Sequence, residues 1–306
     1  MILTVTLNPS VDYVVRVDKL NEGGLNRTND TAFFAGGKGI NVSQVLKELG
    51  IHSTATGFTG GFSGHFIEQS LDDKEITADF IHVEEPSRIN IKLKTEQETE
   101  INAAGPAISE TDVEALFELI GRYGEGDILV LAGSIPESVP KKLYGLLAKK
   151  AHDLGMKIVI DAEKSLLEPA LTTPLHFIKP NHKELSGYVG EKINTIEEAV
   201  KHGRQFYNHH DIEYLMISMA EKGAILIHRD EVYVAEPPAG NLVNSVGAGD
   251  SSVAGFLAGL ERDLTINDAL ALSMACGAST AFSEGLATIN DIQHYQPLVN
   301  IRRSEK

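Results

Sequence analysis

Two glycine-rich segments of this chain have the residue types and spacing to bind an anion. In the first, Asn244-Ser-Val-Gly247-Ala-Gly249-Asp250-Ser-Ser precedes an apolar, helical stretch that reaches Leu260. Two glycines allow a tight turn and leave backbone amides pointing outward at a helix start, where the helix dipole is positive. Such an end suits a phosphate or a developing negative charge. This segment is the strongest chemical signal in the sequence.

Asp250 has two interpretations. Asp and Ser are common in the first turn of a helix, so the carboxylate could be purely structural. Beside a bound phosphate, the same carboxylate could instead take a proton from an attacking hydroxyl group. Glycine-rich turns before helices are frequent, and the motif alone leaves both interpretations open.

The second glycine cluster is Ala35-Gly36-Gly37-Lys38-Gly39-Ile-Asn41, which runs into a predicted helix over 39–49. Close backbone approach at the glycines, together with Lys38 and Asn41, could form a polar pocket for a hydroxylated or phosphorylated ligand. It is not a P-loop, because its glycine spacing is wrong and Gly39 replaces the Ser/Thr that binds magnesium. A flexible turn with a solvated lysine explains the cluster equally well.

A third segment, Lys179-Pro180-Asn181-His-Lys-Glu184, places a carboxamide and a carboxylate on one face of a helix start. These groups could help to hold a hydrated Mg²⁺, which keeps several waters and needs few protein ligands. The same spacing fits a capping box with Asn181 as N-cap and Glu184 three residues later. On this segment alone, the capping role is favoured.

Composition and missing motifs exclude several classes of protein. The 306 residues include 27 Lys+Arg and 43 Asp+Glu, a net charge of −16, which argues against general nucleic-acid binding. A site for an anionic substrate must therefore gather positive charge locally. The single cysteine, Cys276, excludes a disulfide framework and a cysteine-rich zinc site. The sequence also lacks the signatures of zincins, α/β-hydrolases and dinucleotide-binding enzymes.

The sequence shows no sign of membrane insertion or export. Met1 runs directly into Ile-Leu-Thr-Val-Thr-Leu, which is typical of a strand and not of a signal peptide. The longest apolar run, 269–282, is too short to span a bilayer. We therefore expect a soluble, cytoplasmic protein that binds neither membrane nor nucleic acid.

The elements that must position these motifs alternate along most of the chain. After residue 106, short apolar runs typical of strands alternate with helical stretches. We expect strands at 127–133, 157–161, 177–180, 214–218 and 224–228, and helices at 140–154, 196–207 and 249–260. This alternation predicts βαβ units and an α/β fold whose mostly parallel sheet is covered by helices on both faces.

Two segments, 12–35 and 88–105, break this alternation. Both alternate polar and apolar residues with a period of two, which predicts short antiparallel strands with one solvated side. They could be edge hairpins without a function. Because both begin beside glycine-rich motifs, we favour a lid that projects from a main domain of residues 1–11, 36–87 and 106–306.

Together, the motifs resemble those of the ribokinase/PfkB family of ATP-dependent sugar kinases. The resemblance runs nearly end to end and rests on Leu7-Asn-Pro-Ser-Val-Asp12, Gly36-Gly37-Lys38-Gly39-x-Asn41, Arg88, Lys179-Pro-Asn181-x-x-Glu184 and Gly247-Ala-Gly249-Asp250. Each motif is weak alone, but five in the family's order are specific. The resemblance implies a three-layer αβα ribokinase-like fold with a small β-sheet lid over the sugar site.

The phosphosugar branch of the family fits best. The Leu-Asn-Pro-x-x-Asp start and residues 35–42 resemble this branch, and Asn26-Arg27-Thr28 with Phe33-Phe34-Ala35 resembles its fructose 1-phosphate kinases. The implied reaction converts fructose 1-phosphate to fructose 1,6-bisphosphate. The alternatives are a tagatose 6-phosphate or fructose 6-phosphate kinase, and a non-catalytic sugar-phosphate sensor. In the turn of residues 218–223, which the resemblance places on the nucleotide side, Met219-Ala220 stands where the family frequently has Leu-Gly. The family's glycine at Gly223 is retained.

Carried over by position, the resemblance makes Asp250 the catalytic base, kept ionised at the helix start and therefore weakly basic. The implied anion hole is formed by the amides of Gly247, Ala248, Gly249 and Asp250. The residues implied to bind the sugar phosphate are Asp12, Arg27, Gly36, Gly37, Lys38, Asn41, Arg88 and Ser134. Among these, Lys38, Arg88 and Arg27 would hold the phosphate that the substrate already carries.

The resemblance also implies ATP and Mg²⁺ as partners. The residues implied to lie on the nucleotide side are Lys179, Asn181, Ser218, Glu221 and Gly223. Asn181 and Glu184 would organise Mg²⁺ and the ATP phosphates. A homodimer formed through the lid is a further implication.

Overall fold

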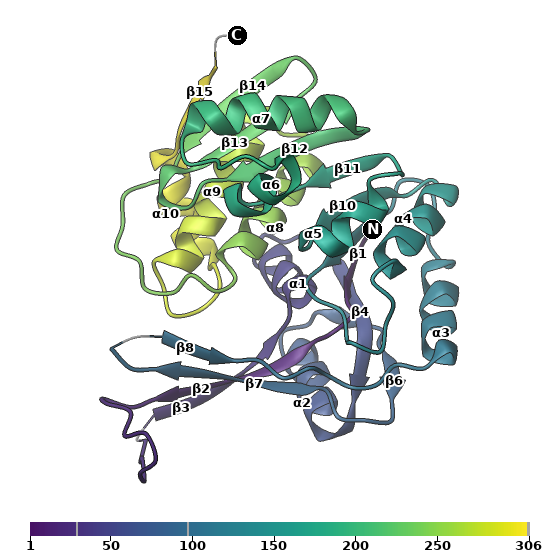
Figure 1. The fold of residues 1–306 in the computed structure, drawn as a ribbon, viewed down its shortest axis with the longest axis vertical. Helices are drawn as coiled ribbons and strands as arrows, with labels where there is room; N and C mark the ends of the chain where they lie inside the picture. Colours follow the sequence, from purple (N-terminus) through teal and green to yellow (C-terminus); the bar gives the residue numbers. More distant parts are fainter. Residues whose placement is uncertain (29, 97, 305–306) are drawn as a thin grey trace.

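A mostly parallel sheet forms the centre of the protein (Figure 1). The computed structural model describes residues 1–28, 30–96 and 98–304, and within them this sheet has eleven strands. Neighbouring strands, in order, are β15 (Asn300–Arg303), β14 (Glu231–Glu236), β13 (Ala224–His228), β12 (Ile212–Ser218), β11 (Leu175–Ile178), β10 (Lys157–Asp161), β9 (Ile128–Ala132), β1 (Ile2–Thr6), β4 (Ser53–Gly60) and β5 (Thr77–Ala78). β6 (Ile81–Val83) also pairs with β4. The ladders from β12 to β5 are parallel, and β13 to β15 extend one edge in antiparallel fashion.

Helices cover both faces of this sheet, as the alternation predicts. On one face lie α3 (Glu110–Ile120), α4 (Leu143–Asp153), α5 (Lys164–Leu167), α6 (His182–Val189) and α7 (Ile196–His209). On the other lie α1 (Lys38–Glu48), α8 (Ala248–Glu261), α9 (Ile266–Ala281) and α10 (Ile289–Tyr295). The three-layer αβα fold is confirmed. Among the described residues, no helix combines the length and apolarity needed to cross a bilayer.

Strand β9 shows why both faces are covered. Its sequence Ile-Leu-Val-Leu-Ala is apolar at every position, and successive side chains of a strand point to opposite faces. Leu129 and Leu131 pack with α3, α4 and their neighbours, whereas Ile128, Val130 and Ala132 pack with α1, α8 and α9. One continuous apolar run therefore supplies two cores.

The predicted helix boundaries are close to those observed, with one informative difference. The helix expected over 140–154 begins at Leu143. Residues 140–143 form a turn in which the Leu143 amide donates to the Pro140 carbonyl at 2.9 Å. The remaining short helical turns are η1 (Glu168–Ala170), η2 (Ala220–Lys222) and η3 (Gln296–Leu298).

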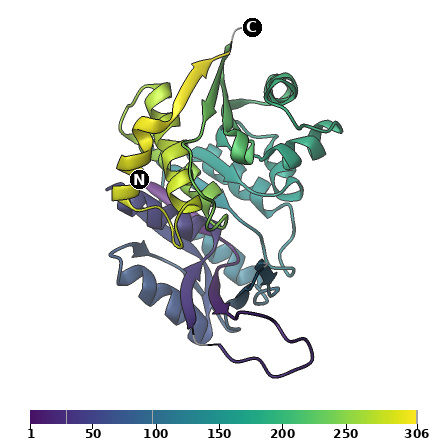
Figure 2. The ribbon, with the colours of Figure 1, turned by 90° about the vertical axis from the view of Figure 1, so that its left-hand side faces the viewer.

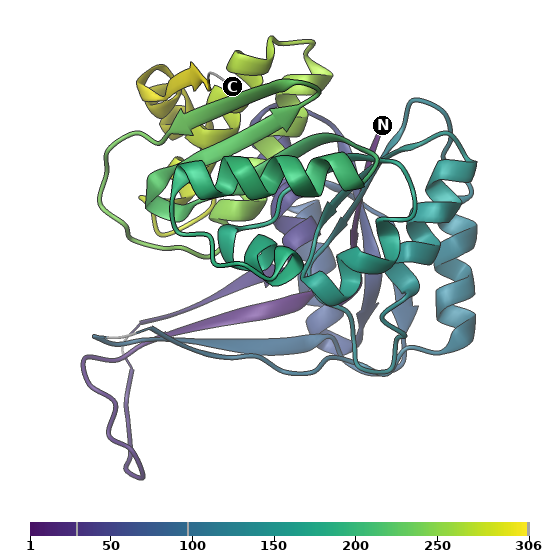
Figure 3. The same ribbon diagram turned by 45° about the horizontal axis from the view of Figure 1, so that its top comes forward.

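A separate four-stranded sheet, which we call the lid, projects from the main domain (Figures 2 and 3). Its order is β3 (Asp30–Gly36), β2 (Ser10–Arg16), β7 (Arg88–Lys94) and β8 (Glu98–Ile101), and α2 (Gly61–Asp72) packs against its base. The outer pairs are antiparallel hairpins, as predicted. The central pair β2–β7 is parallel, so the expectation of only antiparallel strands was wrong. Both strands enter the lid from the main domain and run outward in the same direction.

Helix α8 is enclosed on several sides, because α9, α1 and the sheet all pack against it. Phe256 of α8 is fully buried, with its ring 4.7 Å from that of Phe177 in the sheet. At Gly255, a Cβ atom would lie 2.8 Å from both the Leu272 carbonyl oxygen and the Cys276 sulfur of α9. Gly255 therefore allows α8 and α9 to approach closely.

We expect Gly255→Ala to destabilise the protein by about 1–3 kcal/mol, because the added methyl overpacks the α8–α9 contact. Gly187→Ala is the matched control. Gly187 also lies in a helix, but a Cβ there meets nothing within 4 Å. This control should be neutral or stabilising by about 0.5–1 kcal/mol. Urea unfolding of both variants measures the difference, and equal effects would contradict the packing argument.

Candidate active site

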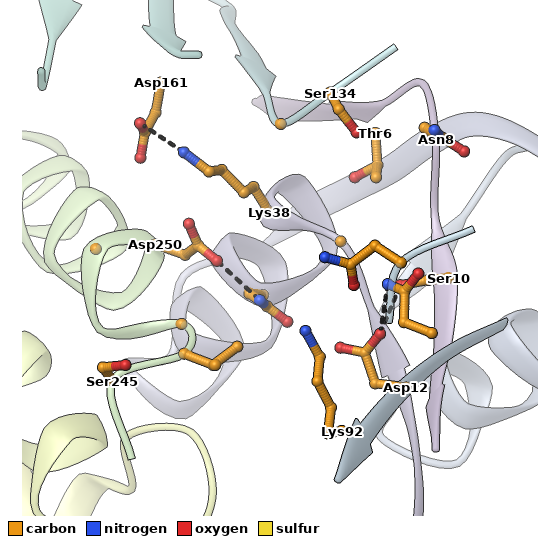
Figure 4. A pocket seen from close by; sticks show the side chains of 18 of the residues that line it. Thr6, Asn8, Ser10, Asp12, Lys38, Lys92, Ser134, Asp161, Ser245 and Asp250 are labelled. Atoms are coloured by element: carbon orange, nitrogen blue, oxygen red, sulfur yellow. Dashed lines mark hydrogen bonds and ion pairs between the residues drawn. The ribbon is translucent and has the colours of Figure 1, made fainter. Parts of the chain in front are cut away.

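The predicted motifs meet at a cavity of about 490 Å³, between the lid and the carboxyl ends of the parallel strands (Figure 4). The main-domain residues that line it at or after strand ends are Thr6 and Asn8 (β1), Gly133 and Ser134 (β9), Asp161 (β10), Lys179 and Asn181 (β11) and Ser218 (β12). Ligands of open α/β sheets bind at this edge, because the loops that follow parallel strands converge there. The lid supplies the opposite wall.

The start of helix α8 forms one end of the cavity. Gly247 is its N-cap with φ of 83°, a left-handed conformation that favours glycine, and Gly247 and Gly249 line the cavity. The first amides of a helix have no acceptor within it. This end therefore presents backbone donors and the positive end of the helix dipole to a ligand.

Asp250 lies in the first turn of α8 and is 5% exposed. Asn41 of α1 donates from Nδ2 to its Oδ2 at 2.8 Å. Burial raises the pKa of Asp250 to about 6, although Lys38 and the Asn41 hydrogen bond act in the opposite direction. The expectation of a weakly basic carboxylate is therefore corrected, since burial outweighs these stabilising contacts. Asp250 is still ionised at neutral pH.

Asp161, which sequence analysis did not single out, holds two lysines beside this carboxylate. Its Oδ1 lies 3.0 Å from the Lys38 ammonium, and its Oδ2 lies 3.4 Å from that of Lys179. Burial would raise the pKa of Asp161, but the two lysines hold it below its usual value. Burial would likewise lower the pKa of Lys38, but Asp161 and Asp250 raise it. Lys38 therefore stays charged.

Lys179 also lies against the start of α8. Its Nζ is 3.2 Å from the position that a Cβ on Gly249 would occupy. The absent side chain thus lets the ammonium approach the free amides. Together, Lys179, Lys38 and the α8 amides place ammonium groups and N–H donors around Asp250.

Asp12 faces the cavity from the lid. Its Oδ1 accepts hydrogen bonds from Ser10 Oγ at 2.8 Å and from Asn90 Nδ2 at 3.0 Å. A Cβ on Gly36 would lie 2.6 Å from Asp12 Oδ2, so glycine is required beside this carboxylate. These contacts fix the carboxylate while keeping it on the cavity wall, where it can accept hydrogen bonds from hydroxyl groups.

Arg88 is anchored to the backbone of two segments. Its Nε donates to the Asn8 carbonyl at 3.1 Å, and a terminal nitrogen donates to the Ala103 carbonyl at 3.3 Å. Burial lowers its pKa, although Asp12 acts against this. The guanidinium is held in one orientation on the cavity wall.

Two lid residues that sequence analysis missed, Asn90 and Lys92, line the cavity with Arg88. All three alternate along β7, so their side chains point to the same face. The signal was present in the sequence, since a strand with Arg88 facing the site must also turn Asn90 and Lys92 toward it. The other cavity residues not predicted are Thr6, Asn8, Ser10, Asn102, Gly133, Asp161, Ser245 and Val246.

Asn181 and Glu184 fulfil the structural role that their spacing favours. The Asn181 side chain accepts from the Lys183 and Glu184 amides at 2.9 Å, and Glu184 Oε2 accepts from the Asn181 amide at 2.8 Å. Both residues also line the cavity. The described residues contain no cluster of three His, Cys, Asp or Glu that could hold a metal ion. This donor set fits a hydrated Mg²⁺ that arrives with a nucleotide, because such an ion needs few protein ligands.

The other predicted site residues lie outside the cavity lining. Arg27 and Glu221 are exposed. Gly36 packs on Asp12, and Ala248 contributes its amide to the start of α8. Gly223 has φ of 97° in the turn after β12, where a Cβ would lie 2.0 Å from the Ala235 carbonyl oxygen. In the same turn Ala220 has φ of 52°, the left-handed conformation that the family's glycine adopts more readily.

Comparisons with known proteins agree with this geometry. A family model described as "pfkB family carbohydrate kinase" matches residues 5–293. A 1-phosphofructokinase of Bacillus subtilis is 45% identical over 99% of this chain and 100% of its own length. A D-tagatose-1-phosphate kinase of Bacillus licheniformis is 35% identical over 98% of this chain and 99% of its own. The structure of phosphofructokinase-2 from Escherichia coli in complex with fructose-6-phosphate has a TM-score of 0.91 at 25% identity, covering 97% of this chain and 98% of that one.

The buried Asp250 charge should make stability depend on pH. The folded-state pKa of about 6 lies above the unfolded value of about 3.9, so stability falls as pH rises through this window. Asp250→Asn removes the charge and keeps the shape. We expect this variant to be more stable than wild type by about 3 kcal/mol at pH 7.5 and by about 1 kcal/mol at pH 4.5. Urea unfolding at both pH values measures this, and a variant less stable at pH 7.5 would contradict it.

Proposed function

Because the chain belongs to the pfkB family of carbohydrate kinases, we propose that it transfers the γ-phosphoryl group of ATP to fructose 1-phosphate, forming fructose 1,6-bisphosphate. Membership establishes a sugar-phosphate kinase, a phosphotransferase with a hydroxyl group as acceptor. The choice of fructose 1-phosphate and the roles of individual residues are our proposals.

One observation carries the proposal: Asp250 lies at the open start of α8, in a cavity that also contains Asp12 and several cations. Phosphoryl transfer depends mainly on positioning and on stabilising the charge of the transferred group. The cavity offers a base, free amides and ammonium groups around one point. It therefore supplies the elements that such a reaction needs.

In the proposed mechanism, Asp250 accepts the proton of the attacking sugar hydroxyl. The hydroxyl oxygen forms a bond to the γ-phosphorus as the bond between that phosphorus and ADP breaks. The amides of Ala248, Gly249 and Asp250 would donate to the oxygens of the transferred group, with Lys38 and Lys179 balancing its charge. A pKa of about 6 leaves Asp250 ionised at neutral pH and more basic than an exposed aspartate.

The sugar would lie between α1 and the lid. Asp12 and Asn41 face the cavity from these two sides and would bind sugar hydroxyls, with Ser134 nearby on the main domain. Asn41 also hydrogen bonds to Asp250. It would therefore link the position of the sugar to that of the base. Closure of the lid would exclude water, which competes for the phosphoryl group.

The nucleotide would lie on the side of Lys179, Asn181 and Ser218. Asn181 and Glu184 would hold a Mg²⁺ ion, largely through its waters, and this ion would neutralise charge on the ATP phosphates. The capping box fixes both side chains at the start of α6. Their orientation toward the cavity is thus set before a ligand binds.

The similarity to both relatives supports a substrate with phosphate on carbon 1. One is named a 1-phosphofructokinase and the other a D-tagatose-1-phosphate kinase, and the first shares more identity with this chain. Kinases of tagatose 6-phosphate or fructose 6-phosphate remain the alternatives within the same mechanism. A sugar-phosphate sensor is disfavoured, because Asp250, Gly247 and Gly249 are all present.

We also propose a homodimer formed through the lid. Two of the β7 side chains that point away from the cavity, Ile89 and Ile91, are 37% and 36% exposed. Phe33 and Ile101 of the neighbouring strands are 53% and 55% exposed, and Tyr13 stacks on Phe33. A sheet face this apolar is typical of a protein interface. A second lid has the matching chemistry to cover it.

Turnover of four sugars tests the proposed reaction. ADP release with Mg-ATP is measured for fructose 1-phosphate, tagatose 6-phosphate, fructose 6-phosphate and fructose. We expect the highest kcat/KM with fructose 1-phosphate, and a loss of at least about 100-fold in kcat for Asp250→Asn with little change in sugar-phosphate binding. Preference for a 6-phosphate would overturn the substrate, and near-normal kcat in the variant would overturn the role of Asp250.

The lid dimer is tested by Ile91→Asp. A buried carboxylate at the interface would oppose association, so we expect wild type to sediment as a dimer and the variant as a monomer at micromolar concentration. Leu298→Asp is the matched control, since Leu298 is a 55% exposed apolar residue in η3 of the main domain. A monomeric wild type, or a variant that stays dimeric, would rule out this interface. Analytical ultracentrifugation gives the result.

A further inference from the structure

The cations that line the cavity fall into two pairs. Among the described residues these are Lys38 and Lys179, which share Asp161, and Arg88 and Lys92, which lie on strand β7 of the lid. The first pair, at the start of α1 and after β11, lies beside Asp250. The second pair is on the opposite wall with Asp12. Each pair offers charged N–H donors to an anion, and two such pairs suit two separate phosphates.

Lys92 is the unusual member of this set. It is 8% exposed, and a lysine is seldom this buried unless it is paired. Its ammonium lies 2.9 Å from Glu100, the residue directly opposite on β8, and Asn102 donates to the same carboxylate at 3.4 Å. Burial would raise the pKa of Glu100, but its contacts with Lys92 lower it. Glu100 is thus held as a carboxylate beside the Lys92 side chain.

Figure 4 shows the Lys92 side chain extending from the lid into the cavity beside Asp12. An ammonium has three N–H donors, and the Glu100 contact accounts for one of them. The others are available to an acceptor in the cavity. Arg88, four residues earlier on the same face, presents its guanidinium to the same wall. An anion between them would receive charge-assisted hydrogen bonds from both.

We propose that Lys92 determines specificity for phosphorylated sugars: with Arg88, its ammonium holds the phosphate that the substrate already carries. Lys38, held by Asp161 next to Asp250, would then serve the group in transfer and not the resident phosphate as its motif had implied. This inference rests on the proposed kinase function. It adds a residue to the substrate site and assigns one phosphate to each pair of cations.

A matched control lies two residues along the same strand. Lys94 lies on the same face of β7 as Lys92. It also forms an ion pair across the hairpin with a glutamate, Glu98. Unlike Lys92, it lies outside the cavity lining. The two lysines thus share strand, face and type of ion pair, and differ in access to the substrate.

The experiment compares Lys92→Met with Lys94→Met. For Lys92→Met we expect a rise of at least about 10-fold in the KM for fructose 1-phosphate, with kcat within about threefold of wild type. Turnover of unphosphorylated fructose should change by less than about twofold, so the preference for the phosphosugar falls by the same factor of about 10. Lys94→Met should match wild type. An unchanged KM in folded Lys92→Met would overturn the inference.

Calorimetric binding of fructose 1-phosphate without ATP separates this inference from the proposed reaction. If wild type binds the sugar phosphate without turnover, the kinase proposal fails, while a weakened Kd in Lys92→Met still supports the role of Lys92. If Lys92→Met does not fold, the Kd of Glu100→Gln for fructose 1-phosphate tests the role of Lys92 instead. Neutralising this competing carboxylate should lower the Kd by at least about threefold. Unchanged or weaker binding in Glu100→Gln would overturn the inference.

Discussion

The arrangement of the site depends on the ionic contacts of one buried carboxylate, Asp161. It terminates β10 and binds Lys38 at the start of α1 and Lys179 after β11. A buried ion pair is weak evidence for stability, because desolvation offsets the attraction. The Asp161 ion pairs instead fix positions, since they bring two ammonium groups from separate segments to one point. This matters in a protein whose net charge is −16. Without Asp161, the cations beside Asp250 would have no common anchor.

Besides Asp161, the geometry of the cavity depends on helix α8. Its N-cap is Gly247, which has no side chain to cap the first amides, so these donors remain open toward the cavity. Rigidity comes instead from the enclosed body of the helix, where Gly255 allows α9 to pack closely and Phe256 contacts the sheet. The same burial raises the pKa of Asp250. A tightly packed helix thus both positions the amides and tunes the carboxylate.

The period of a β-strand gives the lid two chemically different faces. On β7, Arg88, Asn90 and Lys92 face the cavity, while Ile89 and Ile91 face outward. One strand therefore carries a polar face toward the cavity and an apolar, exposed face on its other side. A shift of one residue in register would exchange the two faces. The parallel β2–β7 pairing aligns Ser10 with Arg88 and Asp12 with Asn90, which brings the polar residues of both strands together.

The sequence by itself determined the layers, the lid segments and the local motifs, because these follow from hydrophobic periodicity and from glycine and capping chemistry. It identified Asp250, Asn41, Asp12 and Arg88, all of which line one cavity. It left Asp161 unremarked, since a single charged residue in a strand carries no sign of its partner. Lys92 was also missed, although the alternation of β7 from Arg88 places it on the same face.

Only the tertiary structure decided which charges meet. Lys38 and Asp161 are separated by 123 positions, and Asn41 and Asp250 by 209, so their contacts follow from the order of the strands and from the packing of α1 against α8. Burial likewise depends on the complete fold, and it sets the pKa of Asp250 above that expected at a helix start. Local sequence fixes which groups are available, whereas their distances and solvation arise when distant segments pack together.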